Sequence, residues 1–67
     1  MIIYNHNEIM IKDYQSIRFM DSSHMRIEMA EYDIFLKGEN FEIDYYDNSE
    51  LTMKGKIKVI ECHENRI

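Results

Sequence analysis

The sequence predicts a small all-β domain: a single antiparallel meander of six to seven short strands that forms a curved sheet or roll. Composition is the first reason, because isoleucine occurs eleven times and Tyr plus Phe eight times, against two leucines and one alanine. Isoleucine and aromatic residues favour strands, whereas Ala and Leu favour helices. Periodicity is the second reason, because apolar residues recur at every second position, as on one face of a strand. The short connections suit antiparallel hairpins.

The first half of the chain holds three such alternations. Ile9 and Ile11 form one pair, and Ile17 and Phe19 form another after the polar segment 13–16. A short helix over residues 13–20 is the competing interpretation of that second pair. The clearest alternation covers residues 25–29, with apolar side chains predicted to point inward at Met25, Ile27 and Met29.

The second half continues the pattern after a predicted break at 30–33. Inward positions are expected at Ile34, Leu36, Phe41, Ile43, Tyr45, Leu51, Met53, Ile57 and Val59, with turn chemistry at 47–50. Gly38-Glu39-Asn40 interrupts this series, and Gly55 interrupts it again. An apolar-Lys-Gly pattern ends at each glycine, seventeen residues apart. Glycines in such positions indicate bends or bulges of one curved sheet, and we expect Gly38 to have a positive φ.

Length and composition exclude several classes. The chain has 67 residues, a length that predicts one domain (1–67). It contains a single cysteine, Cys62, so no internal disulfide can form. No apolar run approaches the ~20 residues of a transmembrane helix, and no basic lead marks a secretory signal. These features predict a cytoplasmic protein without a transmembrane segment. The net charge of −5 disfavours a nucleic-acid partner.

No motif predicts catalysis, a metal or a cofactor. Cys62, His63, His6 and His24 lack the paired spacing of zinc ligands. The acids at 44, 47 and 50 do not fit a calcium loop. The serines stand in polar, turn-like contexts, and a core this small leaves little room for a closed pocket. We therefore expect a protein that is not an enzyme.

Two features suggest an interaction surface instead. Lys54, Lys56 and Lys58 alternate, which places them on one strand face as a local basic patch for an acidic partner or anionic lipid, although lysines also protect exposed strand edges. Three apolar residues fall out of phase with their inward neighbours and are candidates for a second apolar face: Met10, Met20 and Phe35. Such a face predicts self-association or a stable protein partner; a two-sided core is the alternative.

The segments 34–43 (IFLKGENFEI), 53–60 (MKGKIKVI) and 11–19 (IKDYQSIRF) resemble the YabP/YqfC family of sporulation proteins. The likeness covers about residues 9–61, and its motif residues, with structural roles in turns, are Gly38, Glu39, Asn40 and Gly55. The chain departs from the pattern at Asp33, where the family commonly has a glycine.

The resemblance implies a non-enzymatic sporulation protein of endospore-forming bacteria. It would act as a small interaction or assembly module at the developing spore envelope, either from the cytoplasm or through peripheral contact with the forespore envelope. A small nucleic-acid-binding β-barrel regulator is the alternative function, and a small-molecule-binding domain is a further one.

Overall fold

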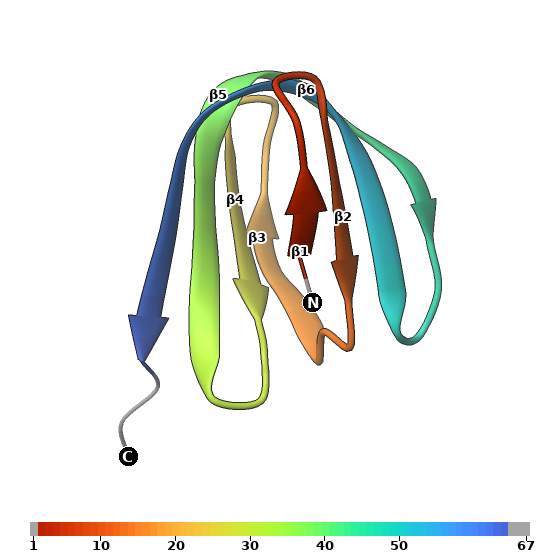
Figure 1. Cartoon of the computed structure of the whole chain (residues 1–67), viewed down its shortest axis with the longest axis vertical. Helices are drawn as coiled ribbons and strands as arrows, with labels where there is room; N and C mark the ends of the chain where they lie inside the picture. The colour runs from red at the N-terminus through yellow and green to blue at the C-terminus, as the bar shows by residue number, and fades with distance from the viewer. Residues whose placement is uncertain (1, 65–67) are drawn as a thin grey trace.

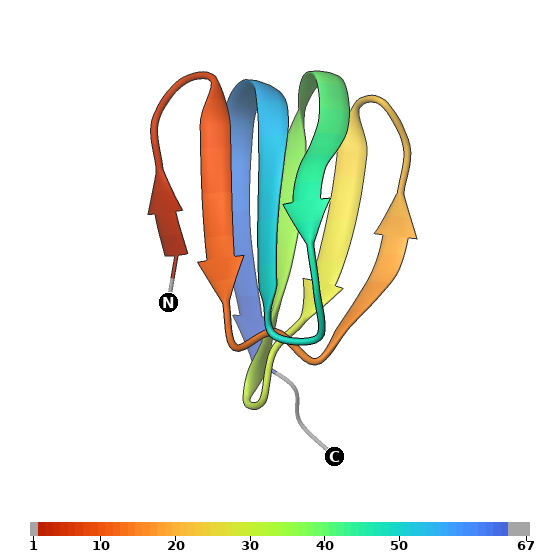
Figure 2. The same cartoon turned by 90° about the vertical axis from the view of Figure 1, so that its right-hand side faces the viewer.

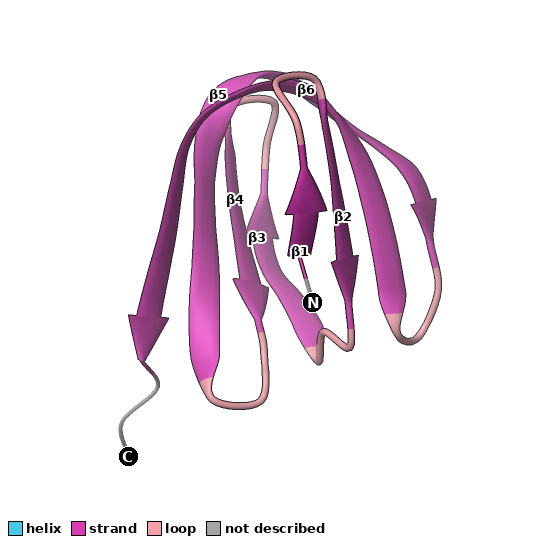
Figure 3. Ribbon diagram, viewed as in Figure 1, coloured by secondary structure: helices cyan, strands magenta, loops and turns pink. Residues whose placement is uncertain are grey.

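The computed structural model describes residues 2–64, and these residues form one open antiparallel sheet (Figure 3). No helix occurs among them, so the all-β prediction is confirmed. Residues 16–20 are a strand, and the helical interpretation of 13–20 is wrong. The six strands are β1 (Ile2–Tyr4), β2 (Glu8–Lys12), β3 (Ser16–Met20), β4 (His24–Glu28), β5 (Tyr32–Tyr46) and β6 (Glu50–Glu64).

The strands lie in the order β1-β2-β6-β5-β4-β3. Strands β3 to β6 follow one another as a meander, and the β1–β2 hairpin adds to the free side of β6. Figure 2 accordingly shows the β1–β2 hairpin on one side of the long β5–β6 pair and the β3–β4 hairpin on the other. All neighbouring strands are antiparallel.

The β5–β6 pair bends across its middle, so that its two ends run down opposite sides of the molecule (Figure 1). This bend divides the sheet into two halves. We call β3, β4, residues 32–37 and residues 59–64 the β4 half. We call β1, β2, residues 42–46 and residues 50–54 the β2 half.

The core draws on both halves, because each contributes the alternate positions of its strands. The fully buried large side chains are Ile9, Ile11, Met25, Ile27, Ile34, Leu36, Leu51 and Met53. Each contributes about 1.5–3 kcal/mol relative to an exposed side chain. These positions match the alternation read from the sequence, and Met29 and Phe41 complete the cluster.

The two glycines lie at the bend, inside continuous strands. A Cβ on Gly38 would lie 1.8 Å from the carbonyl oxygen of Lys56, and a Cβ on Gly55 would lie 2.8 Å from that of Asn40. The ring of Phe41 would be 2.9 Å from either one. Glycine is therefore required because two backbones and a ring meet here.

The expected positive φ at Gly38 is wrong. Positive φ values occur instead at Asn40 (57°), a residue that tolerates the left-handed region, and at Gly55 (142°). The cause is the register between β5 and β6, which shifts on both sides of Gly38. The strand bends at these bulges, and the positive φ therefore occurs at Asn40, two residues after Gly38.

The two short hairpins supply hydrogen bonds to the bend. The backbone N–H groups of Gly38 and Phe41 donate to carbonyls of the β3–β4 turn, at 2.9 and 2.8 Å. Those of Gly55 and Ile57 donate to carbonyls of the β1–β2 turn, at 3.0 and 3.1 Å. Because bulges disrupt the ladder, these turns satisfy backbone groups that would otherwise need another partner. The apolar-Lys-Gly repeat thus marks two equivalent bends, each supported by one hairpin.

Bulges also change the phase at several predicted inward positions. The register shifts between Ile17 and Phe19, so Phe19 points outward and is 53% exposed. It shifts again between Ile43 and Tyr45, and Tyr45 is 53% exposed. Val59, which follows the shift next to Gly38, is exposed as well. The inward predictions for these three residues are wrong because one inserted residue reverses the faces that follow.

Candidate functional site

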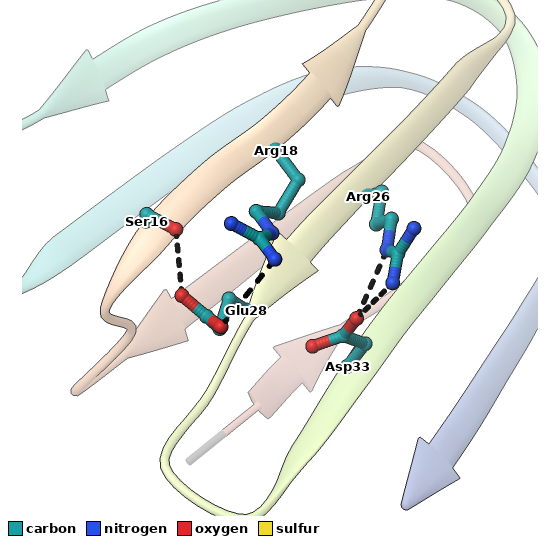
Figure 4. Close-up of polar contacts among 5 residues, drawn as sticks. All are labelled: Ser16, Arg18, Arg26, Glu28 and Asp33. Atoms are coloured by element: carbon teal, nitrogen blue, oxygen red, sulfur yellow. Dashed lines mark hydrogen bonds and ion pairs between the residues drawn. The ribbon is translucent and has the colours of Figure 1, made fainter. Parts of the chain in front are cut away.

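A polar cluster occupies the outer face of the β4 half (Figure 4). The guanidinium of Arg26 donates two hydrogen bonds to Oδ2 of Asp33, from Nε at 2.9 Å and from Nη2 at 2.6 Å. The Asp33 side chain is only 3% exposed, whereas that of Arg26 is 44% exposed. The arginine therefore covers a carboxylate that is almost completely removed from water, which requires such compensation.

The alternation of β4 positions this arginine. Met25 and Ile27 point into the core, so Arg26 between them points outward, opposite Phe35 of β5. Its guanidinium lies 4.9 Å from the centre of the Phe35 ring, a cation–π contact. The rings of His63 and Phe35 meet edge-on, with their centres 4.6 Å apart. Strands β4, β5 and β6 thus contribute to one layer of stacked groups.

Asp33 was predicted to lie in a break, but β5 already begins at Tyr32. Its carboxylate lies on the outer face, because its neighbour Ile34 fills the core. The sequence signal that could have revealed the pair is the β4–β5 hairpin register, in which Asp33 lies opposite Glu28 and therefore diagonal to Arg26.

Glu28 carries the second part of the cluster. Ser16 donates a hydrogen bond from Oγ to Oε1 of Glu28 at 3.0 Å, and Nη2 of Arg18 lies 3.9 Å from Oε2 (Figure 4). The Arg18 side chain is 54% exposed. This longer, solvated pair contributes little to stability and mainly joins β3 to β4.

Beside the cluster, the outer face of the β4 half is hollowed. The groove has a volume of about 390 Å³, and its lining includes Phe19 of β3 and Phe35 of β5 together with the polar residues Asp21, His24, Arg26 and Lys37. Phe19 lies directly opposite Arg26, and Arg26 opposite Phe35. We call this feature the Phe19–Phe35 groove. It offers aromatic surface and cationic side chains, a combination enriched in protein-binding surfaces.

The β3–β4 turn brings together a serine, a histidine and an aspartate. Ser23 Oγ lies 3.0 Å from Nδ1 of His24, and Oδ1 of Asp21 lies 3.5 Å from the same nitrogen. A nucleophilic triad needs the serine and the carboxylate on different ring nitrogens, so that one accepts the proton while the other orients the ring. Here Asp21 Oδ1 also accepts the backbone N–H groups of Ser23 (2.8 Å) and His24 (2.7 Å), which makes it a turn cap.

The lysines of the predicted basic patch have acidic neighbours. Nζ of Lys58 lies 2.7 Å from Oε1 of Glu39, and Nζ of Lys54 lies 3.5 Å from Oδ1 of Asp44. The hydrogen bond from Lys58, together with the charges of Lys58 and Lys56, lowers the pKa of the Glu39 carboxyl below its usual value. The three lysines lie along the bend of β6, and their positive charge is offset locally.

The structure separates the three out-of-phase apolar residues. Met10 lies on the outer face of the β2 half, between the buried Ile9 and Ile11. Phe35 lies on the outer face of the β4 half, and Met20 packs against the core because of the bulge in β3. They do not share a face. The motif residues Gly38, Glu39, Asn40 and Gly55 do come together, at the bend.

Within residues 2–64, no group of three or more His, Cys, Asp or Glu side chains is arranged to hold a metal ion. Cys62 lies opposite Ile34 and His63 opposite Asp33, so the two neighbours point to different faces of β6. The same residues contain no helix that could cross a membrane.

Comparison with known proteins identifies one family. The model of the YabP family matches residues 1–67, the whole chain. No curated protein and no solved structure gives a significant match.

Proposed function

Because the chain belongs to the YabP family, which suggests a protein related to sporulation, we propose that it is a non-catalytic interaction module of the sporulating cell. It acts at the developing spore envelope by binding another protein, from the cytoplasm or at the periphery of the forespore envelope. The observation that carries this proposal is the Phe19–Phe35 groove. Interaction surfaces are enriched in aromatic and arginine side chains that are already held in place, as Phe35 and Arg26 are here.

Two features of the groove fit a protein ligand. Phe19 lies on a strand beside the charged cluster and is 53% exposed, so a bound protein segment could cover its ring. Burial of a phenylalanine side chain contributes about 1.5–3 kcal/mol. Arg26 is paired with Asp33, and Asp21 lies beside His24, so Lys37 is the side chain of the groove that favours an acidic residue beside the apolar anchor of a bound segment.

The absence of catalysis is part of the same proposal. Among the described residues, the one serine–histidine contact uses the same ring nitrogen as the aspartate, and it lies in an exposed turn. General acid–base catalysis works best in a site from which water is excluded, and the outer faces of an open sheet do not provide one.

The test is affinity capture from sporulating cells with two matched variants. Phe19→Glu places a charge in the groove, whereas Tyr46→Glu changes an aromatic residue that is 64% exposed on another strand. We expect the parent and Tyr46→Glu to capture the same protein, and Phe19→Glu to lose it, with circular dichroism spectra alike for all three. Equal capture by the Phe19→Glu variant would refute binding through the groove.

A further inference from the structure

The outer face of the β2 half carries an uncharged row that crosses all four of its strands. Ile3 lies opposite Met10, Met10 opposite Thr52, and Thr52 opposite Tyr45. Ile3 is 55% exposed and Tyr45 is 53% exposed, while Met10 and Thr52 are half-buried between them. The exposed apolar side chains of such a row face water, and a second protein surface could replace that water.

Charged residues flank this row on both sides. On one side, Glu8 of β2 lies opposite Lys54 of β6, and on the other, Lys12 of β2 lies opposite Glu50 of β6. Each strand therefore carries an acid on one side of the row and a base on the other, and the two strands do so in opposite senses. The pattern of these four charges changes sign when it is reflected across the row, while Glu42 and Asp44 of β5 add acids beside Lys54.

We propose that this face is a homodimer interface, in which two copies pack about a two-fold axis that runs along the uncharged row. Rotation about that axis places each side of the row against the opposite side in the second copy. Glu8 then faces Lys12 of the second copy, and Lys54 faces Glu50. All four flanking positions meet an opposite charge, and Met10 and Thr52 meet their own equivalents on the axis. This proposal names one partner within the assembly role proposed above and rests on that role for its purpose.

The geometry agrees with known packing of sheets. An axis across the strands reverses their direction but keeps them aligned, which is the common arrangement of two sheets packed face to face. No other described element lies over this face (Figure 1).

The outer face of the β4 half does not allow the same association. Its equivalent row contains Arg26 between Phe19 and Phe35 and continues to Glu61. A two-fold axis along that row would bring each of these charges against its own copy. Like charges in contact across an interface disfavour association, so self-association selects the β2 half.

The size of the face predicts a weak dimer. Four strands about 4.8 Å apart and rows spanning four residues of about 3.4 Å give roughly 260 Å² of flat area per copy. Stable interfaces bury about 800 Å² per partner, so this contact belongs to the small, transient class. We expect a dissociation constant on the order of 10–1000 µM, reached only where many copies gather.

Sedimentation velocity from micromolar to millimolar protein tests the stoichiometry. We expect a monomer at low concentration, a dimer as the limit, and weaker association in high salt because four ion pairs are screened. A monomer at every concentration, or growth beyond two copies, would overturn the proposal. Thr52→Arg, at the centre of the row, should abolish the dimer, whereas Glu31→Arg, at an exposed position in the β4–β5 turn, should leave it unchanged. If Thr52→Arg dimerises like the parent, the proposal is also wrong.

A charge-swapped chain provides the sharper test. Glu8→Lys, Lys12→Glu, Glu50→Lys and Lys54→Glu together keep the net charge and keep opposite charges paired between β2 and β6 within each copy. Both chains of the comparison also carry Glu42→Gln and Asp44→Asn, because these two acids lie beside position 54. The swapped chain should dimerise with itself as the parent does, but a mixed dimer would place acid against acid and base against base at all four positions. With one chain fluorescently labelled, we expect mixed association at least tenfold weaker than self-association. Equal mixed and self-association would exclude the proposed axis. Partner capture through Phe19 is read separately, so either proposal can fail alone.

Discussion

Gly38 lies at the bend of the sheet, where a Cβ would meet the backbone of β6. We predict that Gly38→Ala destabilises the protein by about 1–3 kcal/mol or more, because its Cβ would fall 1.8 Å from the Lys56 carbonyl oxygen and one strand would have to move. Gly55→Ala should cost a comparable amount, since its φ of 142° is strained for any side chain. Urea denaturation measures both. Lys37→Ala, one position away, is the control, and a Gly38→Ala midpoint equal to that control would contradict the prediction.

The two arginines of the polar cluster provide a second comparison at the same scale. We predict that Arg26→Met costs about 1–3 kcal/mol, because it removes two hydrogen bonds from a carboxylate that is 3% exposed. Arg18→Met should cost less than about 1 kcal/mol, because its contact with Glu28 is 3.9 Å long and solvated. Thermal unfolding of both variants tests whether Arg26→Met costs more stability than Arg18→Met. Equal losses would contradict the prediction. In Arg26→Met/Asp33→Leu, replacement of both partners should recover part of the loss.

Whole elements were predictable where alternation ran without interruption. Residues 25–29 gave the inward set of β4 correctly, because a strand without a bulge keeps its faces. Phe19 and Tyr45 were assigned to the wrong face, because nothing in the local sequence marks a single inserted residue. The partners of Lys58 and Arg26 lie on other strands, so only the strand order and register could have revealed them. The candidate site was therefore less predictable than the fold.

The hairpin turns depend on aspartates whose ionisation affects stability. Hydrogen bonds from the backbone, chiefly of Ser23 and of Ser49, lower the pKa of Asp21 and of Asp47 below the usual 3.8. A lowered pKa in the folded state means that the contribution is complete above about pH 4 and is lost as the pH falls through the folded value. We predict that the thermal midpoint falls below pH 4, and falls less in Asp21→Asn/Asp47→Asn. Scanning calorimetry between pH 2 and 7 measures this, with Glu31→Gln as control. An identical pH dependence in the double variant and the parent would show that other carboxyls control acid unfolding.

At the scale of the whole molecule, the distribution of charge bears on the alternative of a nucleic-acid-binding regulator. Thirteen acids oppose eight bases, and Glu39 and Asp44 lie beside two of the three lysines along the bend. A phosphate backbone binds where several free cations release its counterions, and here acids compete for the same lysines. The bend is thus basic in sequence but nearly neutral in structure.

We therefore predict that the protein passes through a heparin column at about 0.15 M salt, where exposed charges act only over roughly 8 Å. Glu39→Gln/Asp44→Asn removes the acids beside Lys58 and Lys54 and should delay elution, because three lysines are then available on one stretch of strand. Glu61→Gln/Glu64→Gln makes the same change of net charge away from the bend and should elute as the parent does. Equal delay of both double variants would mean that total charge, and not the arrangement at the bend, governs retention. Retention of the parent itself would restore the nucleic-acid alternative, because the local acids would then have failed to neutralise the lysines.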